Sequence, residues 1–171
     1  LSFYWVQLSS IDTTNYKSQY WPKFRDEQRK LLGEVKNGGM AVCSDIGFKD
    51  NVHPTNKRDV GERLARWALN KVYGQNIIPS GPLPLAAKFV KDKVIISFQY
   101  AKGLATSDDQ PARAFSINGK TDIAAVIQSN AVVITTKKKP EYVYYGWKPF
   151  SDGNLINSEK LPASTFKLKV Q

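Results

Sequence analysis

His53 is the only histidine of this 171-residue chain, and it stands in the segment Asp50-Asn51-Val52-His53-Pro54. An aspartate three residues before a histidine can hold the imidazole in one tautomer, so that the ring accepts a proton from a serine hydroxyl. This is the chemistry of serine esterases. Asp45, earlier in the same stretch, is a second candidate for orienting the ring. No recognisable nucleophile motif accompanies these residues, and the sequence therefore predicts half of an active site.

The neighbours of His53 favour a loop at the rim of a sheet. Pro54 biases His53 away from the helical backbone region. The loop follows a buried strand expected over residues 40–44 and precedes an amphipathic helix expected over residues 55–73. In parallel α/β sheets, such strand-to-helix loops carry functional residues. The alternative is structural: the aspartates cap or pair within the loop, and His53 only fills a gap.

The hydrophobic pattern divides the chain near residue 80. The first part alternates strands with helices, which is typical of a parallel sheet covered by helices. Its expected elements are a strand at residues 1–8, a helix opened by Pro22 and ending near residue 36, the strand 40–44 and the helix 55–73. We therefore expect residues 1–79 to form part of an α/β domain.

Residues 80–171 alternate apolar and polar residues with period two, as antiparallel strands do. Val94, Ile96, Phe98 and Tyr100 share one face of an expected strand, and Asn118-Gly119 is a strong signal for a hairpin turn. Further strands are expected over residues 123–127, 131–135 and 142–147. This half is predicted to be a small antiparallel β domain with a loop-like, extended C-terminal tail from residue 150 to residue 171.

Composition argues against several functional classes. The net charge is +10, but the lysines are spread along the chain, without zinc-finger spacing or a basic stretch interleaved with aromatics, so no nucleic-acid partner is expected. No run of about 18 apolar residues exists, and no membrane span is expected. Neither metal-ligand spacing nor a glycine-rich phosphate loop is present, so we expect no metal and no cofactor. Cys43, in an apolar run, is interpreted as a buried thiol.

Several segments, spread in order over nearly the whole chain, form a pattern more specific than any single motif. They are Phe3-Tyr4-Trp5-Val6-Gln7-Leu8, Arg25-Asp26-Glu27-Gln28, Ser44-Asp45-Ile46-Gly47, Val52-His53-Pro54-Thr55-Asn56-Lys57-Arg58-Asp59-Val60-Gly61-Glu62-Arg63-Leu64-Ala65, Ser80-Gly81-Pro82, Tyr145-Gly146-Trp147, Gly153-Asn154-Leu155-Ile156-Asn157 and Leu161-Pro162-Ala163-Ser164-Thr165-Phe166. Together they resemble the sialate O-acetylesterase family of carbohydrate esterases, within the SGNH (GDSL-like) hydrolase group.

The resemblance implies a C-terminal portion: an α/β fold, namely the C-terminal part of an SGNH-type parallel-sheet hydrolase domain followed by a small antiparallel β-sandwich. The family's catalytic Asp-x-x-His maps onto Asp50 and His53, although the spacing before the histidine varies in the family and keeps Asp45 as an alternative orienting acid. The serine nucleophile, in a Gly-Gln-Ser motif, would lie on an N-terminal segment or chain of the same protein, which is the implied partner.

The implied reaction removes O-acetyl groups from sialic acid or related acetylated sugars by two-step acyl transfer. Trp5, Trp21, Trp147 and Tyr145 are candidates for stacking on a sugar, with core or inter-domain packing as the alternative. A secreted, periplasmic or lysosomal location follows from the resemblance alone. The rival interpretation is a non-catalytic carbohydrate-binding or structural fragment in which His53 is vestigial.

Overall fold

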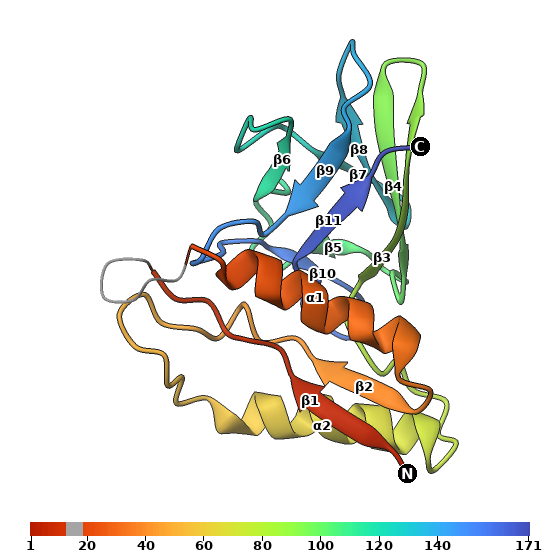
Figure 1. Ribbon diagram of the computed structural model, residues 1–171. Coiled ribbons are helices and arrows are strands. Elements are labelled where there is room, and N and C mark those ends of the chain that lie inside the picture. Colours follow the sequence, from red (N-terminus) through yellow and green to blue (C-terminus); the bar gives the residue numbers. More distant parts are fainter. Residues whose placement is uncertain (13–18) are drawn as a thin grey trace.

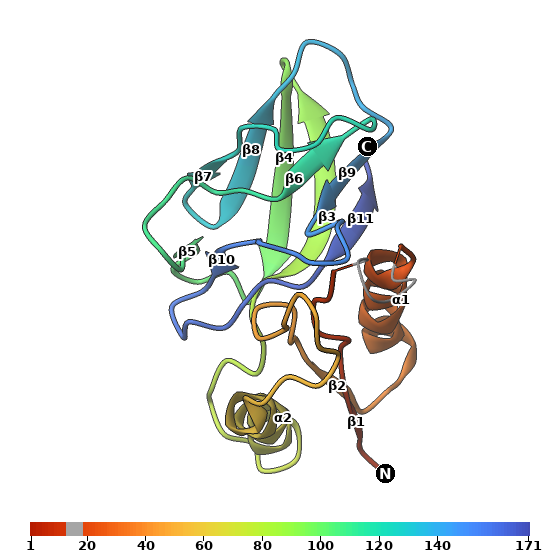
Figure 2. The same ribbon diagram turned by 90° about the vertical axis from the view of Figure 1, so that its left-hand side faces the viewer.

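The computed structural model describes residues 1–12 and 19–171 of the chain (Figure 1). The first part contains β1 (Phe3–Val6), α1 (Trp21–Glu34), β2 (Gly38–Ala41) and α2 (Lys57–Lys71). The two strands pair in parallel, from Phe3 opposite Gly38 to Val6 opposite Ala41. Figure 2 shows this pair between the two helices, with α1 on one side and α2 on the other. The expected order of strand, helix, strand and helix is confirmed at the level of single elements.

The helices begin and pack where their sequences direct them. Pro22 lies in the first turn of α1, where its missing N–H costs no hydrogen bond. At the start of α2, the side chain of Asn56 accepts a hydrogen bond from the backbone N–H of Asp59 at 3.1 Å. Trp67 is buried against β2, and its Nε1 donates to the carbonyl of Met40 at 2.9 Å. This contact needs Gly39, because a Cβ there would lie 2.6 Å from the Trp67 ring.

The second part is built from nine strands. They are β3 (Leu83–Val90), β4 (Lys93–Gln99), β5 (Ala105–Thr106), β6 (Phe115–Ile117), β7 (Val126–Gln128), β8 (Ala131–Thr135), β9 (Tyr142–Tyr145), β10 (Leu155–Ile156) and β11 (Phe166–Lys169). They form a four-stranded sheet in the order β3-β4-β8-β7, a three-stranded sheet in the order β11-β9-β6, and the short pair β10-β5. Figures 1 and 2 show the two larger sheets facing each other as a sandwich.

The core of the molecule lies between these two sheets. Val94 and Ile96 of β4 are fully buried, and Phe98 is nearly so, which confirms the expected period of two. The Phe166 ring lies 5.9 Å from that of Phe98 and stacks 5.7 Å from that of Tyr145. Burying side chains of this size stabilises the fold by roughly 1.5–3 kcal/mol each, so these residues contribute substantially to the stability of the sandwich.

A buried arginine joins the helical part to the sandwich. Arg25 of α1 is fully buried, and its guanidinium donates to the carbonyls of Gly146 at 3.0 Å and Pro149 at 2.9 Å, and to Oγ1 of Thr165 at 3.0 Å. Burial lowers the pKa of Arg25 to about 10. Nε2 of Gln7, also buried, donates to Oγ of Ser164 at 2.9 Å. These buried contacts fix the orientation of the first part on the second.

The prediction of an SGNH-type parallel-sheet hydrolase domain is wrong. The named strands β3 to β11 all pair antiparallel, and the only parallel sheet among the described residues is the four-residue pairing of β1 with β2. The prediction took the alternation of strands and helices in the first 73 residues as the sign of a large parallel sheet. The described residues of this part contain only two strands. Strands β4, β6 and β9 instead alternate buried residues with exposed or half-buried ones, the pattern of sheets with one buried face.

The prediction of a loop-like tail over residues 150–171 also differs from the structure. Strand β11 lies in this segment and pairs with β9, from Phe166 opposite Tyr145 to Lys169 opposite Tyr142. The physical reason is a short period-two pattern: Phe166 is buried and Leu168 packs against the core, while Lys167 and Lys169 point outward. The tail therefore completes the sandwich.

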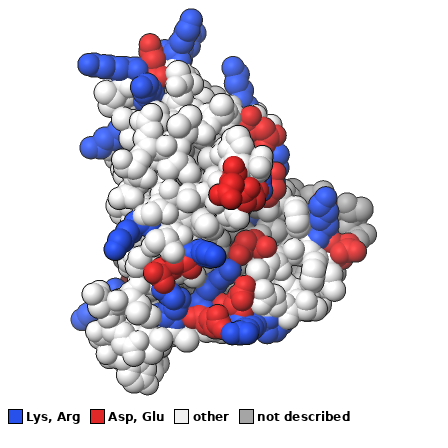
Figure 3. All heavy atoms as spheres, turned by 180° about the vertical axis from the view of Figure 1, so that it is seen from behind, with Lys and Arg blue, Asp and Glu red and all other residues white. Residues whose placement is uncertain are grey.

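Charged side chains of both signs share the back of the molecule. Figure 3 shows Lys and Arg beside Asp and Glu over the lower part of this face, and uncharged residues over much of the sandwich. Two of the pairs involve α2: Arg58 with Glu62 and Arg66 with Glu159, each at 2.8 Å. Within the described part of the chain, neither helix is long and apolar enough to cross a bilayer.

Candidate functional site

The loop between β2 and α2 carries the predicted site residues, and its base is held by packed neighbours. Oγ of Ser10, which follows β1, donates to the carbonyl of Ser44 at 2.6 Å and accepts from the backbone N–H of Ser151 at 3.1 Å. Gly47 approaches Ser10 so closely that a Cβ would lie 2.1 Å from its carbonyl oxygen. The start of the loop is therefore positioned by both the helical part and the sandwich.

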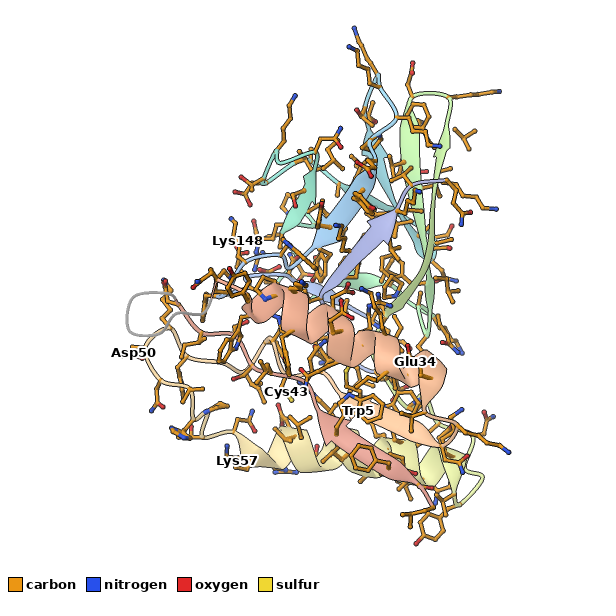
Figure 4. All side chains as sticks on the ribbon, viewed as in Figure 1. Trp5, Glu34, Cys43, Asp50, Lys57 and Lys148 are labelled. Atoms are coloured by element: carbon orange, nitrogen blue, oxygen red, sulfur yellow. The ribbon has the colours of Figure 1, made fainter. Side chains whose placement is uncertain are left out.

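His53 and Asp50 lie together in the outer part of this loop. Both residues are exposed. The backbone N–H of His53 donates to Oδ1 of Asn51 at 2.8 Å, which forms a local turn. Among the described residues, no hydrogen bond or ion pair joins the imidazole to Asp50 or to any other side chain. Figure 4 shows Asp50 at the outer end of the loop, away from the core. The ring is therefore exposed to solvent and accessible to a reacting group.

Asp45 is committed to a different partner. Its Oδ1 accepts a hydrogen bond from Nη1 of Arg63 and its Oδ2 accepts one from Nη2, both at 2.7 Å. The two residues therefore form a bidentate ion pair. Nη1 of Arg63 also donates to the carbonyl of Val42 at 2.6 Å. Burial alone lowers the pKa of Arg63, but the hydrogen bonds and charge of Asp45 outweigh it, so the pKa of this guanidinium is raised. The pair ties α2 to the end of β2 beneath the loop that carries His53.

Sequence reasoning missed the part that Arg63 plays. The signal was present, because Arg63 lies four residues before Trp67 and three after Val60 and so shares the inward face of α2. A charged residue on that face needs a buried or half-buried partner. Two acidic candidates were within reach: Asp59, four residues earlier on α2 and 3.8 Å from Nη2 of Arg63, and Asp45, at the end of the neighbouring strand, which forms the shorter contact. Helix-face geometry could have identified the pair.

Neither a nucleophile nor a metal-ligand group accompanies His53 among the described residues. Ser10, one of the loop serines near the end of β1, is buried, and its hydroxyl is bound to Ser44. No described serine donates a hydrogen bond to the imidazole of His53. Over residues 1–12 and 19–171, no group of three or more His, Cys, Asp or Glu side chains lies together so that it could hold a metal ion.

The aromatic residues considered for sugar stacking have different environments. Tyr145 is buried, and its hydroxyl accepts from the backbone N–H of Leu155 at 2.9 Å. The indole Nε1 of Trp5 donates to the carbonyl of Gln28 at 3.2 Å, and that of Trp21 to the carbonyl of Ser9 at 2.9 Å. These three side chains are engaged in packing contacts. Trp147 is half-buried, as Trp5 and Trp21 are, but among the described residues its indole N–H donates no hydrogen bond.

Comparison with known proteins gives an informative similarity to a solved structure. No protein-family model matches the chain, and no curated protein matches it. Among solved structures, the chain is similar to XAC1771, described as a novel carbohydrate acetylesterase from Xanthomonas citri. The two share 34% sequence identity with a TM-score of 0.89, over 99% of this chain and 41% of that one. The chain therefore spans about two fifths of the length of the protein that it matches, and nearly all of its fold is found there.

Proposed function

We propose that this chain is the histidine-bearing part of a carbohydrate esterase that removes acetyl groups from sugars. The observation that carries the proposal is the similarity, over nearly the whole chain, to a carbohydrate acetylesterase. The exposed His53, beside Asp50 and with no other imidazole in the sequence, supplies a group that can act as a general base.

In the proposed reaction, His53 takes the proton of a serine hydroxyl as the serine oxygen attacks the carbonyl carbon of the acetyl ester. The protonated ring then gives this proton to the sugar oxygen as the ester bond breaks. A water molecule, deprotonated by His53, next attacks the carbonyl carbon of the acetyl-serine, and the protonated ring returns this proton to the serine oxygen as acetate leaves. Asp50 orients the ring and stabilises its cation. The serine belongs to a segment of the same protein outside these residues.

We assign the orienting role to Asp50 in preference to Asp45. Both carboxylate oxygens of Asp45 already accept hydrogen bonds from Arg63, so this aspartate acts in our proposal as a support beneath the loop. Asp50 shares an exposed loop with His53 and has no described side-chain partner. Hydrogen bonds between catalytic groups often tighten only when the substrate or the rest of the site is present.

The surface near the N-terminus supports a partner segment. Strand β1 pairs with β2 along one edge, and in the described chain no strand pairs with its other edge. Phe3 and Val6 of this strand are 59% and 41% exposed, which is high for apolar strand residues. An open edge that carries apolar side chains invites another strand. We propose that the segment bearing the nucleophilic serine docks along this edge and completes the site.

The proposed substrates are O-acetylated sugars, with sialic acid as one member of the class. The substrate pocket is shared with residues outside this chain, so the sugar is selected jointly. Acetate release from O-acetylated sialic acid, compared with release from an acetylated neutral sugar, identifies the preferred substrate.

The test uses the complete protein that contains these residues and measures acetate release from an acetylated sugar. His53→Ala is expected to lower turnover by at least about 10³-fold without changing the unfolding temperature, because an exposed ring adds little to stability. Asp50→Asn should lower turnover as well. Asp45→Asn is the matched control: it removes one side of the ion pair with Arg63, so it should lower stability more than Asp50→Asn while keeping most of the activity.

Full acetate release by the His53→Ala protein would overturn the catalytic proposal. Equal losses of turnover in Asp50→Asn and Asp45→Asn, at matched stability, would overturn the assignment of Asp50. Native and denaturing mass spectrometry of the active particle tests the partner segment. A species of 19.2 kDa that cleaves acetyl esters with no additional polypeptide would show that the serine is not supplied from outside the chain.

A further inference from the structure

Three aromatic rings follow one another on the outer face of the three-stranded sheet. In β9, Val143 and Tyr145 are buried in the core, whereas Tyr142 and Tyr144 are half-buried on the opposite face. The ring centroids of Tyr142 and Tyr144 are 6.3 Å apart, and those of Tyr144 and Trp147 are 5.2 Å apart. We call Tyr142, Tyr144 and Trp147 the aromatic strip. Strand β9, which carries Tyr142 and Tyr144, is turned to the reader in Figure 1, above α1.

Lysines flank one end of the aromatic strip. Lys167 of β11 lies opposite Tyr144 in the sheet, and Lys169 lies opposite Tyr142. The ammonium of Lys167 is 4.0 Å from the ring centroid of Tyr142 and 5.7 Å from that of Tyr144. No carboxylate pairs with either lysine among the described residues. This end of the strip therefore offers aromatic surface together with positive charge that no side chain neutralises.

The other end of the aromatic strip opens into a small pocket with a different character. Trp147 lines this pocket together with Ser116, Thr121, Asp122, Lys148 and Asp152. Nζ of Lys148 lies 3.0 and 3.1 Å from the two carboxylate oxygens of Asp122. Figure 4 shows Lys148 beside the first turn of α1. Hydroxyl, carboxylate and ammonium groups next to an indole can bind the hydroxyls of a sugar whose ring lies on the aromatic face.

We propose that the aromatic strip and its flanking groups bind a glycan that carries a carboxylate. Neutral sugar units lie over Trp147 and Tyr144 with their hydroxyls toward Asp122, and the acidic unit lies at the Tyr142 end, where its carboxylate pairs with the Lys167 ammonium that covers the Tyr142 ring. The site is separate from the loop of His53. It rests on the proposed function only in the choice of a sugar as the ligand, and it would hold an acidic glycan beside the esterase.

The test is calorimetric titration of the chain with xylotetraose bearing one glucuronic acid branch. The matched ligand is the same oligosaccharide with its carboxyl group reduced to an alcohol. Trp147→Ala is expected to weaken binding of both ligands by about five- to tenfold. Lys167→Gln is expected to weaken only the acidic ligand to the level of the reduced one, and Lys167→Arg should keep the preference. Added salt should weaken the acidic ligand more than the reduced one.

Matched controls lie elsewhere on the surface. Tyr73→Ala removes an aromatic ring that is 72% exposed beyond the end of α2, and Lys88→Gln removes an exposed lysine of β3. Both should bind as the wild-type chain does. Absence of binding by the folded wild-type chain, or equal binding by Trp147→Ala, would overturn the site. Equal affinity of wild type for the two ligands would overturn the role of Lys167. Acetate release is not measured here, so a failure of the proposed esterase activity would be a separate result.

Discussion

At the scale of single residues, the charged groups of the candidate site divide into supporting and reacting ones. Arg63 and Asp45 bind each other at two points and are fixed beneath the loop. His53 and Asp50 are exposed in the same loop, and among the described residues neither of their side chains binds another side chain. A base that must move protons between a serine and a sugar has to be accessible, whereas the groups that position its loop do not. The environments match these two tasks.

Cys43 gives a prediction at this scale. Burial raises the pKa of the Cys43 thiol from 9.0 to about 12, so the folded chain holds the thiol proton more tightly than the unfolded chain. This contribution to stability is complete below about pH 9 and is lost as the pH rises toward 12. Between pH 8 and pH 10, the free energy of unfolding of the wild-type chain should fall by about 1 kcal/mol more than that of Cys43→Ala. Urea unfolding at the two pH values measures this difference.

Two results would contradict this account of Cys43. One is a parallel fall in the stability of wild type and Cys43→Ala between the two pH values. The other is rapid reaction of the native chain with a thiol reagent at pH 8, because a thiol that is 1% exposed should react only after unfolding.

At the scale of elements, the sequence predicted local structure well and the larger sheets poorly. The turn at Asn118-Gly119 was predictable because both residues adopt a positive φ, which few other residue pairs tolerate. The helix α2 was predictable from its apolar face, and it lies at Lys57–Lys71, within the expected range 55–73. The prediction of a parallel-sheet domain was wrong, because it inferred a large sheet from what is one short pair of parallel strands. Strand pairing depends on contacts between segments far apart in the chain, and no local pattern specifies these.

The candidate site shows the same limit. His53 and Asp50 could be selected because they are close in the sequence and carry suitable groups. The bond between Asp45 and Arg63 spans 18 residues, and the aromatic strip gains its lysines only through the pairing of β11 with β9. These features depend on which segments the fold brings together, and the tail that contains Lys167 was expected to be a loop.

Gly47 gives the prediction at this scale. A Cβ at this position would lie 2.1 Å from the carbonyl oxygen of Ser10, and a backbone atom cannot turn away as a flexible side chain can. Gly47→Ala should therefore shift the loop of His53, lower the free energy of unfolding by about 1–3 kcal/mol, and reduce acetate release by the complete protein. Thermal unfolding and turnover are measured on the same preparations.

Gly61 provides the matched control for Gly47. It lies exposed in α2, with no atom within 4 Å of an added Cβ. Gly61→Ala should stabilise the chain by about 0.5–1 kcal/mol, because alanine favours the helix interior, and it should leave turnover unchanged. A Gly47→Ala protein as stable and as active as Gly61→Ala would show that the close approach to Ser10 does not position the loop.

At the scale of the whole molecule, the important feature is the junction between the helical part and the sandwich. The guanidinium of Arg25 donates hydrogen bonds to the carbonyls of Gly146 and Pro149. The guanidinium is buried, so water cannot replace it as their donor. The proposed reaction loop belongs to the first part, and the aromatic strip belongs to the second. Their relative position is therefore set by a small number of buried polar contacts.

Arg25→Met tests this junction. Methionine has a similar length but no donors, so the loop carbonyls lose their partners and the chain should be less stable by about 3 kcal/mol or more. Because α1 and α2 contain all of the described helix, circular dichroism at 222 nm follows the first part, and calorimetry follows the whole chain. We expect one cooperative transition in wild type and, in Arg25→Met, loss of the helical signal before the sandwich unfolds.

Lys23→Met is the control, because Lys23 is exposed on the same helix and its replacement should leave a single transition nearly unchanged. Coincident loss of both signals in Arg25→Met, at the wild-type temperature, would mean that the hydrophobic contacts alone hold the two parts together.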